Sequence, residues 1–499
     1  MSVLCASSSG WLLDARALID RGHATCVRWT GGRKSHVKCS FKEQCFQVLT
    51  SHGCHGNSAA LEANNTETVE RTDKQPKKRK RKQGALNQGE IDSQAFHEKI
   101  RSVVLEGTKS LLESARSLGY LNGHAETVKE PVPCHECSLA ALCEMAKELP
   151  LAEDEEQQEC SQALATEGGS TSHVDLFSRV TENKEDRGAV VSLMGEEYVI
   201  PPRSAFLLSD FTRTQPLVQY GRRYDLIVMD PPWENKSVKR SRRYSSLPSS
   251  QLKRLPIPLL ASPGCLVVTW VTNRPSHRRF VREELYPHWG VQVVAEWFWV
   301  KVTTSGQLVF PLDSPHKKPY ETLVLGRYRP PADTPESSSD VAEPPVEDGR
   351  LIVSVPSVLH SHKPSLSDSP HKKPYETLVL GRYRPPADTP ESSSDVAEPP
   401  VEDGRLIVSV PSVLHSHKPS LSEVLRPYVR AEARRLELFA RNLQPGWTSW
   451  GNEVLKFQHT GYFTLTPSDD PRPGTDPPGG ADPDPPQPGS PGKTSLPQP

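Results

Sequence analysis

The sequence predicts an α/β protein built on an open sheet, preceded by a small or largely disordered N-terminal region. A short apolar run, Leu226 to Met229, has a charged residue before it and a double proline after it, which is typical of a buried parallel strand. Further strand-like runs at 265–271 and 291–302 flank a helical pattern at 280–286. With 48 prolines and an apolar fraction of 35%, much of the 499-residue chain cannot pack, so one sizeable core is expected.

The tetrapeptide Asp230-Pro231-Pro232-Trp233 follows the first of these strands. Ligands of open α/β sheets bind outside the carboxyl ends of the strands, so Asp230 is placed for chemistry. The prolines have no N–H, so the turn is expected to leave backbone carbonyls as unpaired acceptors. The Asp230 carboxylate and the Pro231 carbonyl then offer acceptors without a donor, and Trp233 adds a flat apolar face. This combination fits a planar ring with an amino group, such as adenine, whose amine attacks a methyl donor.

A second motif lies near the end of the chain, at Glu437-Leu-Phe-Ala-Arg-Asn442 and Gly451-Asn-Glu453. Together with Asp230-Pro-Pro-Trp, it resembles the MT-A70 family of adenine methyltransferases. The resemblance implies a Rossmann-like sheet that uses S-adenosylmethionine and needs no metal. It implies methylation of the N6 amine of adenine in nucleic acid, with 2′-O-methyladenosine in small nuclear RNA as the substrate. The alternatives are adenine in DNA, a catalytically inactive RNA-binding partner, and an unrelated proline turn or metal-binding aspartate of a nucleotidase.

The resemblance also implies roles for individual residues. The tetrapeptide 230–233 would be catalytic. Carboxylates can accept hydrogen bonds from ribose hydroxyls, and amides can read the edge of adenine. The residues expected to contact S-adenosylmethionine are Asp210, Phe211, Asp230, Lys418, Glu437, Arg441, Asn442, Asn452 and Glu453. Without the resemblance, Asp210 could cap the turn after its strand, and the remaining charges could lie on a helix surface.

A basic segment follows Trp233, with five cations and no acid in residues 236–243. Such a loop beside a base-sized pocket would hold the phosphates that flank a flipped or single-stranded nucleotide. The alternative is a solvated loop, and Arg274, Arg278 and Arg279 could extend the surface. The predicted substrate-binding residues are Asn235, Lys236, Lys239, Arg240, Arg242, Arg243 and Tyr244.

Composition divides the chain into four regions. Residues 1–75 form a small, β-rich N-terminal region, and residues 76–190 contain a basic run, a helical pattern at 92–121 and an acidic linker at 153–172. The methyltransferase domain spans 191–465, and the tail, 466–499, is rich in Pro and Gly. The six basic residues of 77–82 predict a nuclear-targeting signal, hence the nucleus or the nucleus and cytosol, although a solvated charge run is the alternative.

Bulk properties exclude several classes. The net charge is −1, so nucleic-acid binding must depend on local patches. Nine of the ten cysteines precede residue 161, without the spacing of a disulfide framework, so we expect reduced thiols. Cys134 and Cys137 form one Cys-x-x-Cys pair without a second, which favours free thiols over zinc. The sequence has no apolar run of about 18 residues or more, so no membrane segment is expected.

Residues 313–367 recur without one change as residues 368–422. An identical pair of segments differs from a solenoid, in which three or more diverged units stack, and indicates a tandem exon duplication or an assembly error. Only one copy of each strand can occupy the sheet. We expect the first-copy strand, 320–327, beside 297–302, and the second-copy Lys418 just before a helix at 423–441. Residues 350–405 would then form an extruded loop.

Overall fold

The computed structural model describes residues 2–30, 33–51, 88–121, 143, 161–164, 175–234, 247–314, 317–330 and 398–468. The chain divides into two compact units, Met1–Pro330 with Pro399–Pro499, and Pro331–Glu398. The fold described below belongs to the first unit. Among the described residues, none of the helices is both long and apolar enough to cross a membrane.

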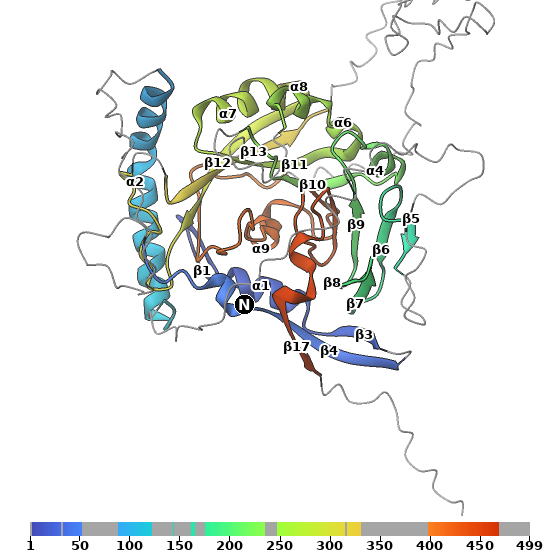
Figure 1. Ribbon diagram of the computed structural model, residues 1–499. Coiled ribbons are helices and arrows are strands. Elements are labelled where there is room, and N and C mark those ends of the chain that lie inside the picture. Colours follow the sequence, from blue (N-terminus) through green and yellow to red (C-terminus); the bar gives the residue numbers. More distant parts are fainter. Residues whose placement is uncertain are drawn as a thin grey trace, which may run out of the picture. The chain divides into compact units, whose positions relative to one another are not determined.

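The predicted α/β class is confirmed by a large mixed sheet (Figure 1). Its strand order is β1-β2-β14-β12-β13-β11-β10-β15-β16-β9-β6-β5. Most of the central strands run parallel, and β13 is antiparallel to both of its neighbours. The strands are β1 (Val3–Ser7), β2 (Gly10–Leu13), β5 (Ser161–Ala163), β6 (Val180–Asn183), β9 (Ser204–Leu208), β10 (Tyr224–Met229), β11 (Ala261–Val271), β12 (Val291–Lys301), β13 (Tyr320–Tyr328), β14 (Leu406–Ser409), β15 (Arg435–Leu438) and β16 (Trp447–Gly451).

A second sheet has the order β17-β4-β3-β7-β8. Its strands are β3 (Cys26–Thr30), β4 (Arg33–Phe41), β7 (Gly188–Leu193), β8 (Glu196–Ile200) and β17 (Phe463–Pro467). The expected β-rich character of the N-terminal segment is confirmed for its described part, and its strands join both sheets: β2 is parallel to β14, and β3 is parallel to β7. The exact domain boundaries stay a prediction.

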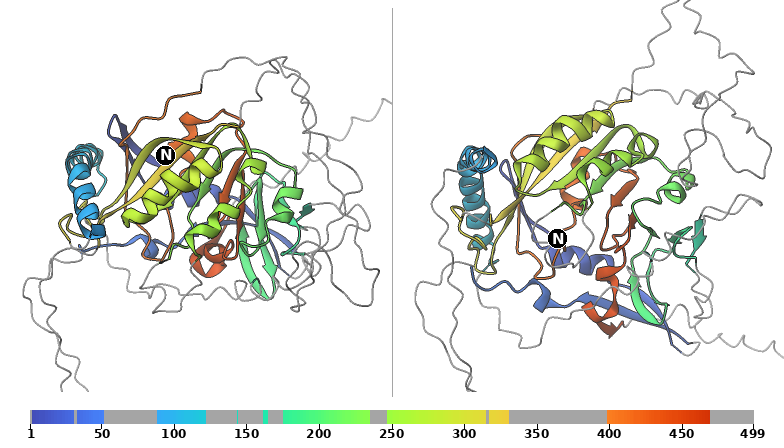
Figure 2. Two further views of the ribbon diagram at one scale, coloured as in Figure 1. Left: turned by 90° about the horizontal axis from the view of Figure 1, so that it is seen from above. Right: turned by 45° about the horizontal axis from the view of Figure 1, so that its top comes forward.

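Helices cover the large sheet on both faces. They are α1 (Ala15–Gly22), α2 (Gln88–Ser117), α4 (Gln215–Gln219), α6 (Ile257–Leu260), α7 (Pro275–Phe280), α8 (Tyr286–His288) and α9 (Ser422–Leu425), with a π turn at Val281–Leu285 and 3-10 turns at Glu43–Phe46, Ser249–Arg254, Arg426–Tyr428, Lys456–Gln458 and Thr460–Tyr462. Figure 1 shows α7 and α8 on one side of the strands and α9 on the other. The helix predicted at 92–121 is confirmed as α2, which lies beside the sheet in both views of Figure 2.

Strand β10 is buried on both faces, because it is apolar without alternation. Ile227 and Met229 pack in the cluster that contains α6 and the 281–286 turn. Leu226 and Val228 point to the opposite face and pack in the cluster that contains α9. The strand therefore lies in the centre of the molecule's core, and its carboxyl end holds Asp230 rigidly.

The structure uses one strand from each copy of the duplicated segment. The first-copy strand β13 pairs with β12, with Leu323 opposite Trp297, which confirms the predicted pairing. The second-copy strand β14 pairs with the other edge of β12, with Leu406 opposite Phe298. Most of the stretch predicted to be extruded, 350–397, lies outside the described residues.

Two sequence predictions are wrong. The helix expected over 423–441 is limited to α9 and a 3-10 turn, and residues 435–438 form β15 instead. Pro427 has no N–H to continue a helix, and Leu436 and Leu438 alternate with half-buried residues as they would on a strand. The expected linker at 153–172 contains β5, which pairs in parallel with β6.

Deleting residues 331–385 would restore a single copy of the repeat while keeping both β13 and β14. We expect the folded sheet to persist, with a thermal midpoint unchanged or raised by no more than about 3 °C, because the shorter connection recovers only about 1 kcal/mol of loop-closure entropy. Calorimetry on the full chain and the deletion variant measures this. A variant that no longer folds would show that residues 331–385 supply contacts the sheet needs, and replacing 331–385 by a Gly/Ser segment of equal length is the control.

Candidate active site

The predicted functional residues gather at one edge of the large sheet. Strands β10, β15, β16 and β9 are mutually parallel, so their carboxyl ends meet there. Asp230 follows β10, Arg441 follows β15, Glu453 follows β16 and Asp210 follows β9. The chain leaves β10 toward β11 on one side, and β15 lies on the other side of β10. Where neighbouring connections go to opposite sides in this way, a crevice forms outside the carboxyl ends of the strands, and ligands of open α/β sheets bind there.

Asp230 is paired with two cations that the sequence did not place beside it. Its Oδ2 accepts a hydrogen bond from Arg441 at 2.7 Å and lies 3.6 Å from the Lys418 Nζ. Arg441 also donates to Glu453, at 3.2 Å, and its side chain is only 10% exposed. The expectation of a notch without donors is therefore wrong. Asp230 Oδ1 has no hydrogen-bond partner among the described residues, so one carboxylate oxygen remains available to a ligand.

The two proline carbonyls are not unpaired either. The Pro231 oxygen accepts the Trp233 N–H at 2.8 Å, and the Pro232 oxygen accepts the Leu247 N–H at 3.0 Å. These bonds close the turn and fix the direction of both carbonyls. A carbonyl oxygen has two lone pairs, so the Pro231 oxygen can still accept a second hydrogen bond.

Trp233 is held on its edge and on one face. Its Nε1 donates to the Trp270 carbonyl at 2.9 Å, and its ring stacks on His277 with centroids 4.8 Å apart and planes 19° from parallel. His277 is in turn bonded to the Thr272 hydroxyl at 2.7 Å. Burial lowers the pKa of His277 to about 4, so the imidazole is neutral near pH 7. The indole is thus fixed as one wall of a cleft, and no sequence pattern indicates His277 as its partner.

The cleft above Asp230 has a volume of about 1000 Å³. The tetrapeptide 230–233 and Arg441 line its inner end. Its other walls include Thr272 and Asn273 after β11, Ser93 and His97 of α2, and Glu321 and Lys418. This volume is at the upper end of the range for pockets that hold compact organic ligands, roughly 300–1000 Å³.

Lys418 is anchored by Glu321, which the sequence did not identify. Its Nζ donates to Glu321 at 2.7 Å and lies 5.4 Å from the Trp270 ring centroid. Burial opposes the charge on Glu321, but Lys418 and Lys301 outweigh it and lower the pKa of this carboxyl to about 2. Glu321 belongs to the first copy of the repeat and Lys418 to the second, so the site draws on both copies.

A second cavity, of about 130 Å³, lies beside Arg441. The predicted cofactor residues Asp210, Phe211, Asn452 and Glu453 line it together with Arg441 and Trp450. Asp210 Oδ1 also accepts the Thr212 N–H at 3.0 Å, so the predicted alternative, a turn cap, is present as well. The buried Trp450 Nε1 has no hydrogen-bond partner among the described residues, so this wall carries a donor for a ligand.

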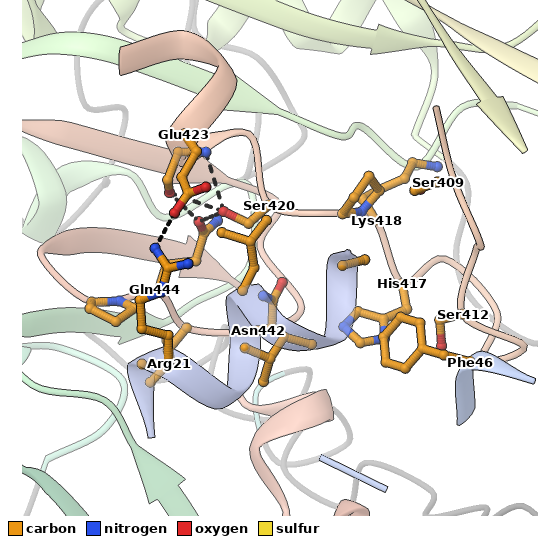
Figure 3. Close-up of a pocket in the computed structure, with 18 of the residues that line it drawn as sticks. Arg21, Phe46, Ser409, Ser412, His417, Lys418, Ser420, Glu423, Asn442 and Gln444 are labelled. Atoms are coloured by element: carbon orange, nitrogen blue, oxygen red, sulfur yellow. Dashed lines mark hydrogen bonds and ion pairs between the residues drawn. The ribbon is translucent and has the colours of Figure 1, made fainter. Parts of the chain in front are cut away.

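A third cavity, of about 300 Å³, lies behind Lys418, between α1 and the segments 409–412, 417–423 and 442–445 (Figure 3). Asn442 lines this cavity and not the one around Asp210. Figure 3 shows Ser420, Glu423 and Gln444 gathered at one side, with His417 and Phe46 at the other. Gln444, absent from the sequence prediction, joins this cavity to Glu437, because its Nε2 donates to the Glu437 carboxylate at 2.8 Å.

The predicted substrate-binding residues at 235–244 lie outside the described residues. The proposed extension of that basic surface is wrong for two of its three arginines, because each of the two forms an ion pair with a carboxylate. Arg278 pairs with Glu296 at 3.1 Å, and Arg279 pairs with Asp92 at 3.1 Å.

The nuclear-targeting run at 77–82 and the Cys134–Cys137 pair also lie outside the described part. Within the described ranges, no three His, Cys, Asp or Glu side chains are grouped so that they could hold a metal ion.

Comparison with known proteins gives the family. The MT-A70 family model matches residues 224–369 and again residues 366–453, and the two matches meet near the junction of the repeat. N(6)-adenine-specific methyltransferase METTL4 of Homo sapiens is 47% identical over 397 residues, which cover 79% of this chain and 72% of that protein. The chain belongs to the MT-A70 family of methyltransferases.

Two further MT-A70 relatives match shorter parts of the chain. The N6-methyladenosine RNA methyltransferase MTA1 of Pyricularia oryzae is 29% identical over 287 residues, covering 56% of this chain and 59% of that protein. The DNA N6-methyl methyltransferase of Caenorhabditis elegans is 34% identical over 189 residues, covering 36% of this chain and 47% of that protein.

Glu437 should make stability depend on pH. Burial raises its carboxyl pKa to about 7, well above the ordinary 4.5 of the unfolded chain. The folded state therefore favours the protonated acid, and stability present below pH 4.5 is lost as pH rises through 7. Relative to Glu437→Gln, we expect the wild-type free energy of unfolding to fall by up to about 3 kcal/mol over this range. Denaturant titrations at several pH values measure it, and parallel curves for the two proteins would contradict it.

Proposed function

We propose that this chain transfers a methyl group from S-adenosylmethionine to the N6 amine of adenine in nucleic acid, with 2′-O-methyladenosine in small nuclear RNA as the substrate. The observation that supports this most directly is the position of the Asp230–Arg441 pair. Arg441 lines both the cleft that contains Trp233 and the cavity that contains Asp210 and Asn452. A donor in one space and an acceptor in the other would therefore meet at Asp230.

The residues around the smaller cavity fit the proposed cofactor. Asn452 can read an adenine edge, Asp210 and Glu453 can accept ribose hydroxyls, and Phe211 offers an apolar surface. The unpartnered Trp450 indole N–H gives a further buried donor. By the family resemblance, Lys418 would hold the methionine carboxylate, and Glu437 and Asn442 would contact the ribose and adenine. When bound, S-adenosylmethionine supplies a methyl group that is already activated by its sulfonium.

The chain's own groups would orient and activate the acceptor. Trp233, fixed by His277, lines the cleft beside Asp230 and is 6% exposed, so an adenine ring would meet only part of its indole. The free Asp230 Oδ1 and the remaining lone pair of the Pro231 oxygen can each accept an amine hydrogen. Drawing both hydrogens out of the ring plane favours the pyramidal nitrogen that attacks a methyl group, and the carboxylate stabilises the positive charge that develops there. Holding the two reactants in place accounts for much of the remaining acceleration.

The relatives' names and two basic segments bear on the substrate. The human relative is named an N(6)-adenine-specific methyltransferase, and the Pyricularia oryzae relative an RNA methyltransferase. The Caenorhabditis elegans relative is named a DNA methyltransferase, so DNA adenine is the second candidate. The basic run at 77–82 supports a nuclear location, where small nuclear RNA is found, and the basic residues at 235–244 would contact phosphates of either nucleic acid. A catalytically inactive partner is less well supported, because the tetrad and both cavities are intact.

Matched oligonucleotides test the proposal. We expect the full chain to transfer labelled methyl to N6 in RNA that carries 2′-O-methyladenosine, faster than to unmodified RNA or to DNA of the same sequence. Asp230→Ala should lower the rate by about 100-fold or more, since it removes a group aimed at developing charge.

A cooperative thermal unfolding transition, measured by calorimetry, is the control for folding of Asp230→Ala. Unchanged methylation by Asp230→Ala would contradict the mechanism. Faster methylation of DNA would make the DNA proposal the better one, and donor binding without transfer to any adenine would favour the inactive partner.

A further inference from the structure

The outer part of the cleft contains a buried acceptor with no partner. The Asn273 Nδ2 donates to the Tyr320 carbonyl at 2.7 Å. A carbonyl can only accept, so this bond fixes the amide with its Nδ2 toward Tyr320 and its Oδ1 turned away. Among the described residues, the buried Asn273 Oδ1 has no hydrogen-bond partner. Such an acceptor costs free energy unless a ligand donates to it, and Asn273 lines the same cleft as Asp230 and Trp233.

The wall continues from Asn273 to α2 as a chain of neutral polar groups. The Tyr320 hydroxyl is bonded to His97 Nδ1, and His97 Nε2 is bonded to the Ser93 hydroxyl at 3.0 Å. His97 stays neutral near pH 7, because burial and Lys318 lower its pKa to about 4. All of these side chains line the cleft together with Lys318, so neutral hydrogen-bonding groups lie beside a cation there.

The segment before β13 adds a cation and an aromatic ring to the cleft. The Lys317 Nζ lies 5.3 Å from the ring centroid of Phe310, and both residues line the cleft. An exposed cation, an aromatic ring and hydrogen-bonding groups are what proteins combine to bind single-stranded nucleic acid. The cleft is also larger than one nucleotide requires, and the strand on one side of the target adenine must leave through it.

We propose that the part of the cleft between Asn273 and α2 binds the nucleotide next to the target adenine, with Asn273 Oδ1 accepting a hydrogen bond from its base and Lys317 contacting its phosphate. This subsite rests on the proposed function, since it presumes a nucleic-acid substrate with adenine at Asp230. Every RNA base has an N–H donor on its Watson–Crick edge, so Asn273 would detect that a base is present there and would orient it.

Binding of five-nucleotide RNAs, followed by fluorescence anisotropy, tests the subsite. The parent RNA has adenine at its centre, and two further RNAs lack the base on its 5′ or its 3′ side. For the wild-type chain we expect one of these abasic RNAs to bind about tenfold more weakly than the parent. Asn273→Ala should bind the parent RNA about tenfold more weakly than the wild-type chain does. It should no longer distinguish the parent from that abasic RNA. Unchanged S-adenosylmethionine affinity shows that the variant is folded.

Lys317 provides a second, independent measurement. Lys317→Ala should reduce the slope of log affinity against log salt by about 0.7, the value for one phosphate of a single strand. Lys109→Ala is the matched control, because Lys109 lies on α2 with its side chain 78% exposed and does not line the cleft. An unchanged slope for Lys317→Ala, or an equal change for both variants, would overturn the phosphate contact.

The outcomes separate the subsite from the proposed function. The subsite is overturned if Asn273→Ala discriminates the abasic RNAs as the wild type does, or if the wild type binds all three RNAs equally. Methyl transfer to the central adenine is measured on the same RNAs. If the wild-type chain discriminates between the parent and abasic RNAs but transfers no methyl group, the proposed function is overturned and the subsite is supported. If it transfers the methyl group but does not discriminate between these RNAs, the subsite is overturned and the proposed function is supported.

Discussion

The buried ion pair between Asp230 and Arg441 is the contact on which the rest of the site depends. It joins the turn after β10 to the loop after β15, which are more than two hundred positions apart in sequence but adjacent in the sheet. Each side chain is at most 14% exposed, and each charge is stabilised by this pair and by one further partner, Lys418 for Asp230 and Glu453 for Arg441. Breaking a buried pair of this kind costs about 3–5 kcal/mol. Because Arg441 also binds Glu453, the same cation fixes the third strand end of the site.

The duplicated segment leaves this arrangement intact because the sheet takes β13 from one copy and β14 from the other. Arg327, at the end of β13, donates to the carbonyls of Gly264, Pro399 and Tyr428. It therefore ties the point where the chain leaves the sheet to the point where it returns. The Glu321–Lys418 ion pair then joins the two copies directly at the active site. A composite of two copies can thus reproduce what a single copy would supply.

Local pattern was sufficient to predict the strands at 226–229, 265–271, 291–302 and 320–327 and the position of Asp230. An apolar run ended by Asp-Pro-Pro identifies a buried strand and its carboxyl end, and the 55-residue repeat forces a choice of which copy pairs where. The prediction of a helix over 423–441 was wrong because the spacing of its apolar residues also fits a short helix followed by a strand. Pairing with β10 stabilises the strand.

The prediction of a notch without donors was wrong for a different reason. The cations that reach Asp230 come from Lys418 and Arg441, and only the folded sheet brings them there. His277, Glu321, Asn273 and Gln444 were missed for the same reason, since each gains its place from a partner distant in sequence or on a neighbouring turn. Family resemblance had already named Lys418 and Arg441, but for the cofactor and not for the catalytic carboxylate. In the structure, Arg441 lines both the cavity that contains Asp210 and the cleft that contains Asp230.

In the proposed mechanism, Arg441 acts on the acceptor amine indirectly, by orienting the Asp230 carboxylate. Methyl-transfer rates of Asp230→Asn, Arg441→Met and the double variant, at saturating S-adenosylmethionine, test it most directly. If Arg441 works by orienting the carboxylate, the double variant should be about as slow as the slower single variant, because the second change removes nothing further. Rate losses that multiply in the double variant would show that the two side chains act independently and would contradict the account.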